Sequence, residues 1–143
     1  MHYVANITRE GKHWLADFPD APGCQTFADS REELAAAAAE ALEGWLEAHF
    51  VGRQDTPPRP KRRKVDEHAL RVSVRPNLAI AMQLRWARTD RGMTQSDVAQ
   101  VVGMKQQQIA ALERPNGNPT IETVRRVAQA LGVEMNVDIS AHR

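Results

Sequence analysis

Apolar and polar residues alternate twice near the start of the chain, which predicts two β-strands. A period of two places the apolar members on one face of each strand. The apolar members of the two sets are Tyr3, Ala5, Ile7, Trp14, Ala16 and Phe18. Gly11 between the sets suits a hairpin turn. The Pro-Gly turn of residues 20–23 then predicts a short third strand over residues 24–28.

A helix is predicted next, because Ser30 and Glu33 have the spacing of a capping box. An alanine-rich stretch follows that should end near Gly52. Its inward residues recur at helical spacing. They are Leu34, Ala38, Ala41, Leu42, Trp45 and His49. Alternation returns at residues 70–74, a possible fourth strand that could complete the N-terminal sheet.

The remaining sequence predicts four short helices and a last strand. Asn77 can cap the first helix, which runs to about Arg91, and Thr120 can cap the fourth. The intermediate helices span residues 94–102 and 106–113. Residues expected to point inward in the fourth helix are Ile121, Val124, Ala128 and Leu131. Val133–Ile139 alternates and is predicted to be a terminal strand. The fold class is therefore α+β, with a β-β-β-α-β domain before an all-α domain.

Charge divides the 143 residues into three parts, although the net charge is only +1. Residues 1–52 sum to −6, residues 53–75 to +5 and residues 76–143 to +2. We expect a basic partner for the front and a polyanion for the back. The Pro/Lys/Arg-rich residues 53–69 are predicted to be a linker. Lys61–Lys64 within it could touch DNA backbone or simply be solvated.

Several functional classes find little support in the composition. No apolar run is long enough to span a membrane and no secretory signal is visible, so a cytoplasmic location is expected. Cys24 is the only cysteine and is expected to pack in a core. The five histidines show no metal-ligand spacing, and no cofactor is expected. A two-metal nuclease needs clustered carboxylates, for which only Asp17 and Asp20 are candidates, so no enzymatic role is expected.

The segment from Thr94 to Glu113 carries the clearest functional signal, that of a helix-turn-helix. Ala99 is small where two helices would cross, and Gly103 suits the tight turn. Apolar residues would hold both helices to a core. They are Val98, Val102, Ile109 and Leu112. The second helix begins with Lys105-Gln106-Gln107-Gln108, and glutamine can pair bidentately with adenine in the major groove.

The residues Met93–Ala99, Val102–Met104, Gln106–Ile109 and Asn118–Val124 resemble the Cro-like repressor domains. The resemblance covers about residues 78–134. It implies that Gln95 contacts a phosphate, that Lys105, Gln106 and Gln107 face bases, and that Arg88 pairs with Glu113. Ala111 departs from the family, where many relatives carry a base-reading side chain. The candidate DNA-binding residues are Gln95, Lys105, Gln106, Gln107, Gln108, Asn116 and Asn118.

The N-terminal Phe18-Pro-Asp-Ala-Pro-Gly-Cys24, followed by a capped helix rich in Ala and Glu, is similar to HicB-type antitoxins. The resemblance implies a partial ribonuclease H-like domain that binds a basic, RNA-cleaving HicA-type toxin, and a chain that represses its own operon. A homodimer is expected, because an operator with two half-sites needs two reading helices, and Val133–Ile139 is the expected dimer element. Two alternatives remain: a repressor with a ligand-sensing N-terminal module, and a metal-dependent nuclease.

Overall fold

The computed structural model describes residues 1–53 and 56–141, and the chain divides into two compact units. The first unit is Met1–Ala79 and the second begins at Ile80. The described residues form four strands and five α-helices, so the α+β fold class is confirmed. None of the helices in this part of the chain is both long and apolar enough to cross a bilayer.

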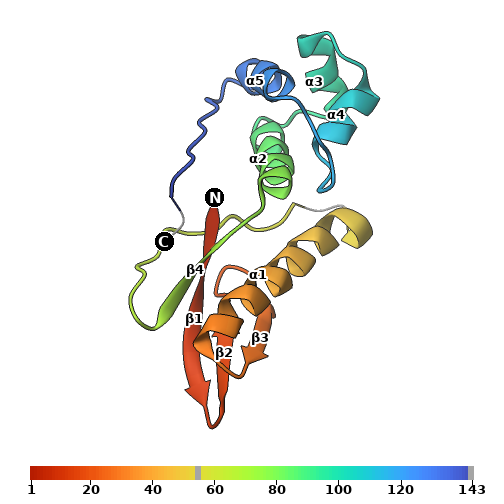
Figure 1. Cartoon of the computed structure of the whole chain (residues 1–143). Coiled ribbons are helices and arrows are strands. Elements are labelled where there is room, and N and C mark those ends of the chain that lie inside the picture. Colours follow the sequence, from red (N-terminus) through yellow and green to blue (C-terminus); the bar gives the residue numbers. More distant parts are fainter. Residues whose placement is uncertain (54–55, 142–143) are drawn as a thin grey trace. The chain divides into compact units, whose positions relative to one another are not determined.

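The first unit is built on an antiparallel sheet in the order β3-β2-β1-β4 (Figure 1). The strands are β1 (His2–Glu10), β2 (His13–Asp17), β3 (Gln25–Ala28) and β4 (Ala69–Ser73). Gly11 at the β1–β2 turn has φ of 61°, a conformation that glycine adopts without steric cost. The stretch after the long helix does return to the sheet, because β4 pairs with β1. The predicted β-β-β-α-β order is thus confirmed.

Helix α1 (Arg31–Ala48) begins at the predicted cap and packs on one face of this sheet (Figure 1). The backbone N–H of Glu33 donates to Ser30 Oγ at 3.1 Å. The buried residues of α1 are Leu34, Ala38, Leu42 and Leu46. Four of the residues predicted to share one sheet face are buried, namely Tyr3, Ala5, Ile7 and Ala16, and Val4 between the first two is buried as well. A single π-helical turn, η1 (His49–Arg53), follows α1.

Residues 56–68 connect the helical part of the first unit to β4 without regular secondary structure, and we call them the basic strap. The predicted linker also contained residues 54 and 55, which lie outside the described residues. The Tyr3 hydroxyl donates to the carbonyl of Pro58 at 2.5 Å, and Pro57 is fully buried. Arg31 donates to the carbonyl of Glu67 at 2.8 Å. The strap is therefore held on the first unit by specific contacts.

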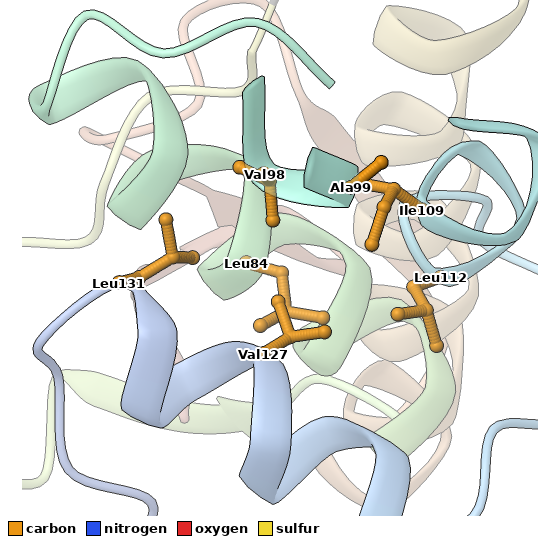
Figure 2. Close-up of a cluster of buried hydrophobic side chains, with 7 residues drawn as sticks. All are labelled: Leu84, Val98, Ala99, Ile109, Leu112, Val127 and Leu131. Carbon is orange, nitrogen blue, oxygen red and sulfur yellow. The ribbon is translucent and has the colours of Figure 1, made fainter. Parts of the chain in front are cut away.

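The second unit consists of short helices around one apolar cluster (Figure 2). Its helices are α2 (Pro76–Asp90, whose first residues belong to the first unit), α3 (Gln95–Val102), α4 (Gln106–Leu112) and α5 (Ile121–Ala130). The side chains that meet in the cluster are Leu84, Val98, Ala99, Ile109, Leu112, Val127 and Leu131. Each of the four helices, or the residue that ends it, contributes to this core, so their packing is mutually dependent.

Three local predictions are wrong. The terminal strand at Val133–Ile139 does not form, because a strand needs a hydrogen-bonding partner and the described part of the second unit holds no other strand. Ile121 is 71% exposed, since it is the first residue of α5 and the core is reached only from Val124 onward. Helix α2 begins at Pro76, one residue before the expected cap, because proline suits the first turn of a helix.

Candidate nucleic-acid interface

The α3–turn–α4 segment has the local geometry that its sequence predicts. Thr94 Oγ1 accepts from the backbone N–H of Asp97 at 3.0 Å, and Asp97 Oδ2 accepts from the backbone N–H of Thr94 at 2.8 Å. The hydrogen bond from the Thr94 backbone N–H is the largest cause that lowers the pKa of the Asp97 carboxyl, which stays ionised at the helix N-terminus.

The turn between the two helices depends on Ala99 and Gly103. Gly103 has φ of 75°, and both its N–H and that of Met104 donate to the Ala99 carbonyl at 2.9 Å. Ala99 is 4% exposed within the cluster of the second unit, so a larger side chain there would push the helices apart. Arg126 of α5 donates to the carbonyl of Val102 at 3.1 Å. The end of α3 is thus held both by the turn and by α5.

The start of α4 presents a polar surface to solvent. Lys105, Gln106, Gln107 and Gln108 are all exposed, whereas Ile109 and Leu112 point into the core. The surface is therefore displayed by a helix whose opposite side is held by packing. Ala111 is also exposed and offers no hydrogen-bonding side chain to a ligand.

Two of these glutamines have side-chain partners within the unit. Gln106 Nε2 donates to Gln95 Oε1 at 2.7 Å, which joins the first residue of α3 to the first residue of α4. Gln108 Oε1 accepts from the backbone N–H of Lys105 at 2.8 Å and so caps α4. The sequence analysis grouped Gln95, Gln106 and Gln108 with Gln107 as DNA-contacting residues. In the structure Gln108 caps α4, and Gln95 and Gln106 are hydrogen-bonded to each other.

The loop after α4 carries the other two candidates. Asn116 and Asn118 are both exposed. Between them, Gly117 lies so close to α4 that an added Cβ would be 2.8 Å from the carbonyl oxygen of Ala111. Apart from the glycine itself, no sequence pattern indicates this requirement. The loop therefore packs closely on α4 at position 117, where a side chain larger than that of glycine does not fit, and the two asparagines lie on either side of this contact.

A buried ion pair supports the interface from behind. Glu113 is 2% exposed, and its carboxylate accepts from Arg88 Nε at 2.7 Å and from Arg88 Nη2 at 2.9 Å. Arg88 also donates to the carbonyl of Met93 at 2.8 Å. Arg85, one turn earlier in α2, adds a second contact to the same carboxylate at 3.4 Å. Sequence reasoning missed Arg85, although its spacing of three from Arg88 places both on one helix face.

The residues considered for other chemistry in the first unit have structural surroundings. The Asp20 side chain is 4% exposed and accepts from Arg63 and from the backbone of Lys61. The hydrogen bond from Arg63 is the largest cause that lowers the pKa of Asp20. Burial raises the pKa of the Cys24 thiol to about 11, which keeps it protonated and a poor nucleophile at neutral pH. Across residues 1–53 and 56–141, no three His, Cys, Asp or Glu side chains gather as metal ligands would.

The capped α3, the glycine turn and the exposed start of α4 define a helix-turn-helix domain. Residues 84–137 match the family model described as helix-turn-helix. The structure also matches that of a HipA-HipB-O2-O3 complex, with a TM-score of 0.43 and 26% identity, over 48% of this chain and 97% of the other.

Two curated relatives match along almost the whole chain. Antitoxin HicB 1 of Photorhabdus laumondii subsp. laumondii is 29% identical over 142 residues, which cover 97% of this chain and 87% of the relative. Antitoxin HicB 2 of the same organism is 25% identical over 137 residues, which cover 96% and 95%. The expected resemblance to HicB-type antitoxins with a C-terminal helix-turn-helix domain is therefore confirmed.

Proposed function

We propose that this chain is a non-enzymatic antitoxin that represses its own operon through the helix-turn-helix and neutralises a HicA-type toxin through its N-terminal unit. The observation that carries the proposal is the exposed start of α4, held by packing behind it. The similarity to two proteins named Antitoxin HicB supports the antitoxin role. Both activities belong to the cytoplasm, where operator DNA and a newly made toxin are found.

In the DNA-bound state, the start of α4 enters the major groove. Gln106 and Gln107 then read base edges, since a glutamine amide can pair bidentately with adenine. The bond from Gln106 Nε2 to Gln95 Oε1 supports this assignment, because it orients the Gln106 amide and leaves its Oε1 free to accept from a base. Gln95 adds a phosphate contact from its amide nitrogen, and Lys105 adds a positive charge beside the groove.

Contacts to the DNA backbone come from the flanks of α4. Asn116 and Asn118, in the loop that follows, hydrogen-bond to phosphates. Backbone contacts of this kind set the register of the protein on the duplex, and they carry no direct sequence information. The ion pair of Arg88 and Glu113 holds α2 and the end of α4 together and does not touch DNA.

The toxin meets the acidic N-terminal unit. Residues 1–52 carry a net charge of −6, and exposed carboxylates such as Glu32 and Glu40 lie on α1. A toxin that holds RNA needs a basic surface, so the two proteins attract each other over a distance. Reversal of these exposed charges should mainly lower the association rate and make it less sensitive to salt.

The working form on the operator is a homodimer. Val133, Val137 and Ile139 are 38%, 64% and 92% exposed and alternate with polar residues. Two such segments, one from each copy, can pair as antiparallel strands and cover one another's apolar side chains. The pairing supplies the hydrogen-bond partner that a single chain lacks, and it would place two α4 helices on successive half-sites.

The experiment needs only the chain, the DNA upstream of its reading frame and the product of the adjacent gene. The purified chain should protect a short palindromic stretch of that DNA from nuclease digestion. A chain truncated after Ala79, without the helix-turn-helix, should still restore growth to cells that express the toxin, provided that the truncated chain is shown to be folded. If no short basic protein is encoded beside it while DNA protection persists, a repressor with a ligand-sensing module replaces the antitoxin.

A further inference from the structure

The basic strap, residues 56–68, is anchored at several places along its length. Pro57 is fully buried, and the Pro58 carbonyl accepts from the Tyr3 hydroxyl at 2.5 Å. At the other end, the His68 carbonyl accepts from the backbone N–H of Ile7 at 2.8 Å. A segment with no helix or strand thus follows a defined course over the first unit.

The strongest anchor lies in the middle of the strap, at Asp20. Its Oδ2 accepts from the backbone N–H of Lys61 and from Arg63 Nε, both at 2.9 Å, and its Oδ1 accepts from Arg63 Nη2 at 2.7 Å. The bidentate pair with a nearly buried carboxylate is a strong charge-assisted contact. One cation of the strap is therefore neutralised, and its backbone is held at that point.

The cations on either side of Arg63 are left outside this clamp. Arg62 and Lys64 are exposed, and no ion pair of either is found among the residues that the structure describes. The acids nearest in sequence to this pair, Asp66 and Glu67, instead lie beside His68. The anchored strap thus displays uncompensated positive charge on a unit that is acidic elsewhere.

Anchoring changes what such cations can do. A flexible basic segment loses backbone conformational entropy at each residue when a ligand orders it. The strap is ordered by folding, so its cations can contact a polyanion without that loss. Like charges held close together also repel one another, and a line of phosphates relieves the repulsion.

We propose that Arg62 and Lys64 form a second nucleic-acid contact, which binds backbone phosphates of the duplex DNA to which the helix-turn-helix is bound. The inference rests on the proposed function, because the helix-turn-helix keeps flanking duplex at high local concentration around the strap. The contact is to backbone phosphates, so it adds affinity and salt dependence but no base preference.

The test measures binding of the full-length chain to a 40-base-pair duplex of random sequence, and to the upstream DNA, over a series of salt concentrations. The double variant Arg62→Ala/Lys64→Ala should lower the slope of log Kobs against log salt by about 2 on both duplexes, since each lost phosphate contact removes about 1. The preference for upstream over random DNA should not change.

Arg9→Ala/Lys12→Ala is the matched control, because it removes the same charge from the end of β1 and the turn that follows it in the same unit. Its slope should equal that of the unsubstituted chain. If both double variants keep the original slope, this inference is wrong while the proposed DNA binding stands. If the Arg62→Ala/Lys64→Ala variant lost affinity only for a single-stranded RNA measured in parallel, while its slope on the DNA duplexes stayed unchanged, the inference would also be wrong. A chain that binds neither duplex at low salt overturns the proposed function as well.

The anchor can be tested separately with Asp20→Asn, which keeps the size of the side chain and removes its charge. A released strap should bind the random duplex more weakly although the variant is one unit more positive. Tighter binding, as expected from charge alone, would show that anchoring does not position these cations. Far-UV circular dichroism and protection of the strap from trypsin report whether the variant stays folded and whether the strap has been released.

Discussion

Replacement of Glu113 by leucine should strongly destabilise the second unit. The carboxylate is 2% exposed and contacts Arg88 and Arg85, whose side chains are 15% and 13% exposed. The substitution fills most of the volume but leaves two guanidinium groups beside an apolar site. Removal of one partner of a buried pair costs about 3–5 kcal/mol. Since small domains are stable by about 5–15 kcal/mol, the loss should be a large part of the total.

Urea unfolding of full-length chain measures this loss if the two units are observed separately. Trp86 lies in α2 within the second unit, whereas Trp14 and Trp45 lie in the first. Fluorescence in a Trp14→Phe/Trp45→Phe background therefore reports on the second unit. Glu122→Leu is the control, because its pair with Arg125 is exposed to solvent and contributes little to stability.

The double variant Arg88→Met/Glu113→Leu separates the charge effect from packing. An apolar pair of similar volume should restore much of the stability that Glu113→Leu removes, because the double variant no longer holds the Arg88 charge beside an apolar side chain. The reasoning fails if Glu113→Leu costs no more than the Glu122→Leu control, or if the double variant is less stable than Glu113→Leu alone.

Four further predictions concern DNA, acid, packing and assembly. Gln95→Ala should weaken binding of upstream and random DNA by a similar factor in a filter-binding assay, because a phosphate contact is blind to sequence. The lowered pKa of Asp20 means that its clamp stabilises the fold above the usual Asp pKa of 3.8 and loses this effect as the pH falls through the lowered value. Asp20→Asn should therefore show a smaller loss of thermal stability on acidification than the unsubstituted chain. An equal loss would show that the ion pair of Asp20 and Arg63 does not stabilise the fold. Gly117→Ala should lower the melting temperature of the second unit, since its Cβ meets the Ala111 carbonyl oxygen at 2.8 Å, whereas Gly44→Ala in α1, where the Cβ meets open space, should not lower the melting temperature of the first unit. Truncation after Gly132 should give a monomer by light scattering, and a stable dimer would contradict strand pairing.

Local signals in the sequence predicted most elements of the fold. Ser30, Thr94 and Thr120 each accept a hydrogen bond from the backbone N–H three residues on, as their spacing from the helix start requires. Gly103 ends α3 in the left-handed conformation expected of a glycine cap. Such features depend on a few neighbouring residues, so a pattern of four letters is enough to recognise them.

Contacts between distant residues were less predictable. Nothing in the sequence links Asp20 to Arg63. The sequence marks Asp20 only as a candidate metal ligand, and Arg63 only as one cation of a run that could touch DNA or be solvated. The alternation at Val133–Ile139 indicates only that one side of the segment is apolar. It does not indicate whether a second strand is available to pair with it. The bond between Gln106 and Gln95 depends on how α3 and α4 cross, which is set by packing at Ala99.

The most direct test of base reading compares affinities for upstream and random duplex DNA in the unsubstituted chain and in the variants Gln106→Ala and Gln107→Ala. Each substitution should cost about 1–3 kcal/mol on the upstream DNA and much less on the random duplex. Gln108→Ala, which removes a capping oxygen from the same helix, serves as the comparison for a merely structural loss. Equal losses on the two duplexes for Gln107→Ala would show that the start of α4 does not read bases.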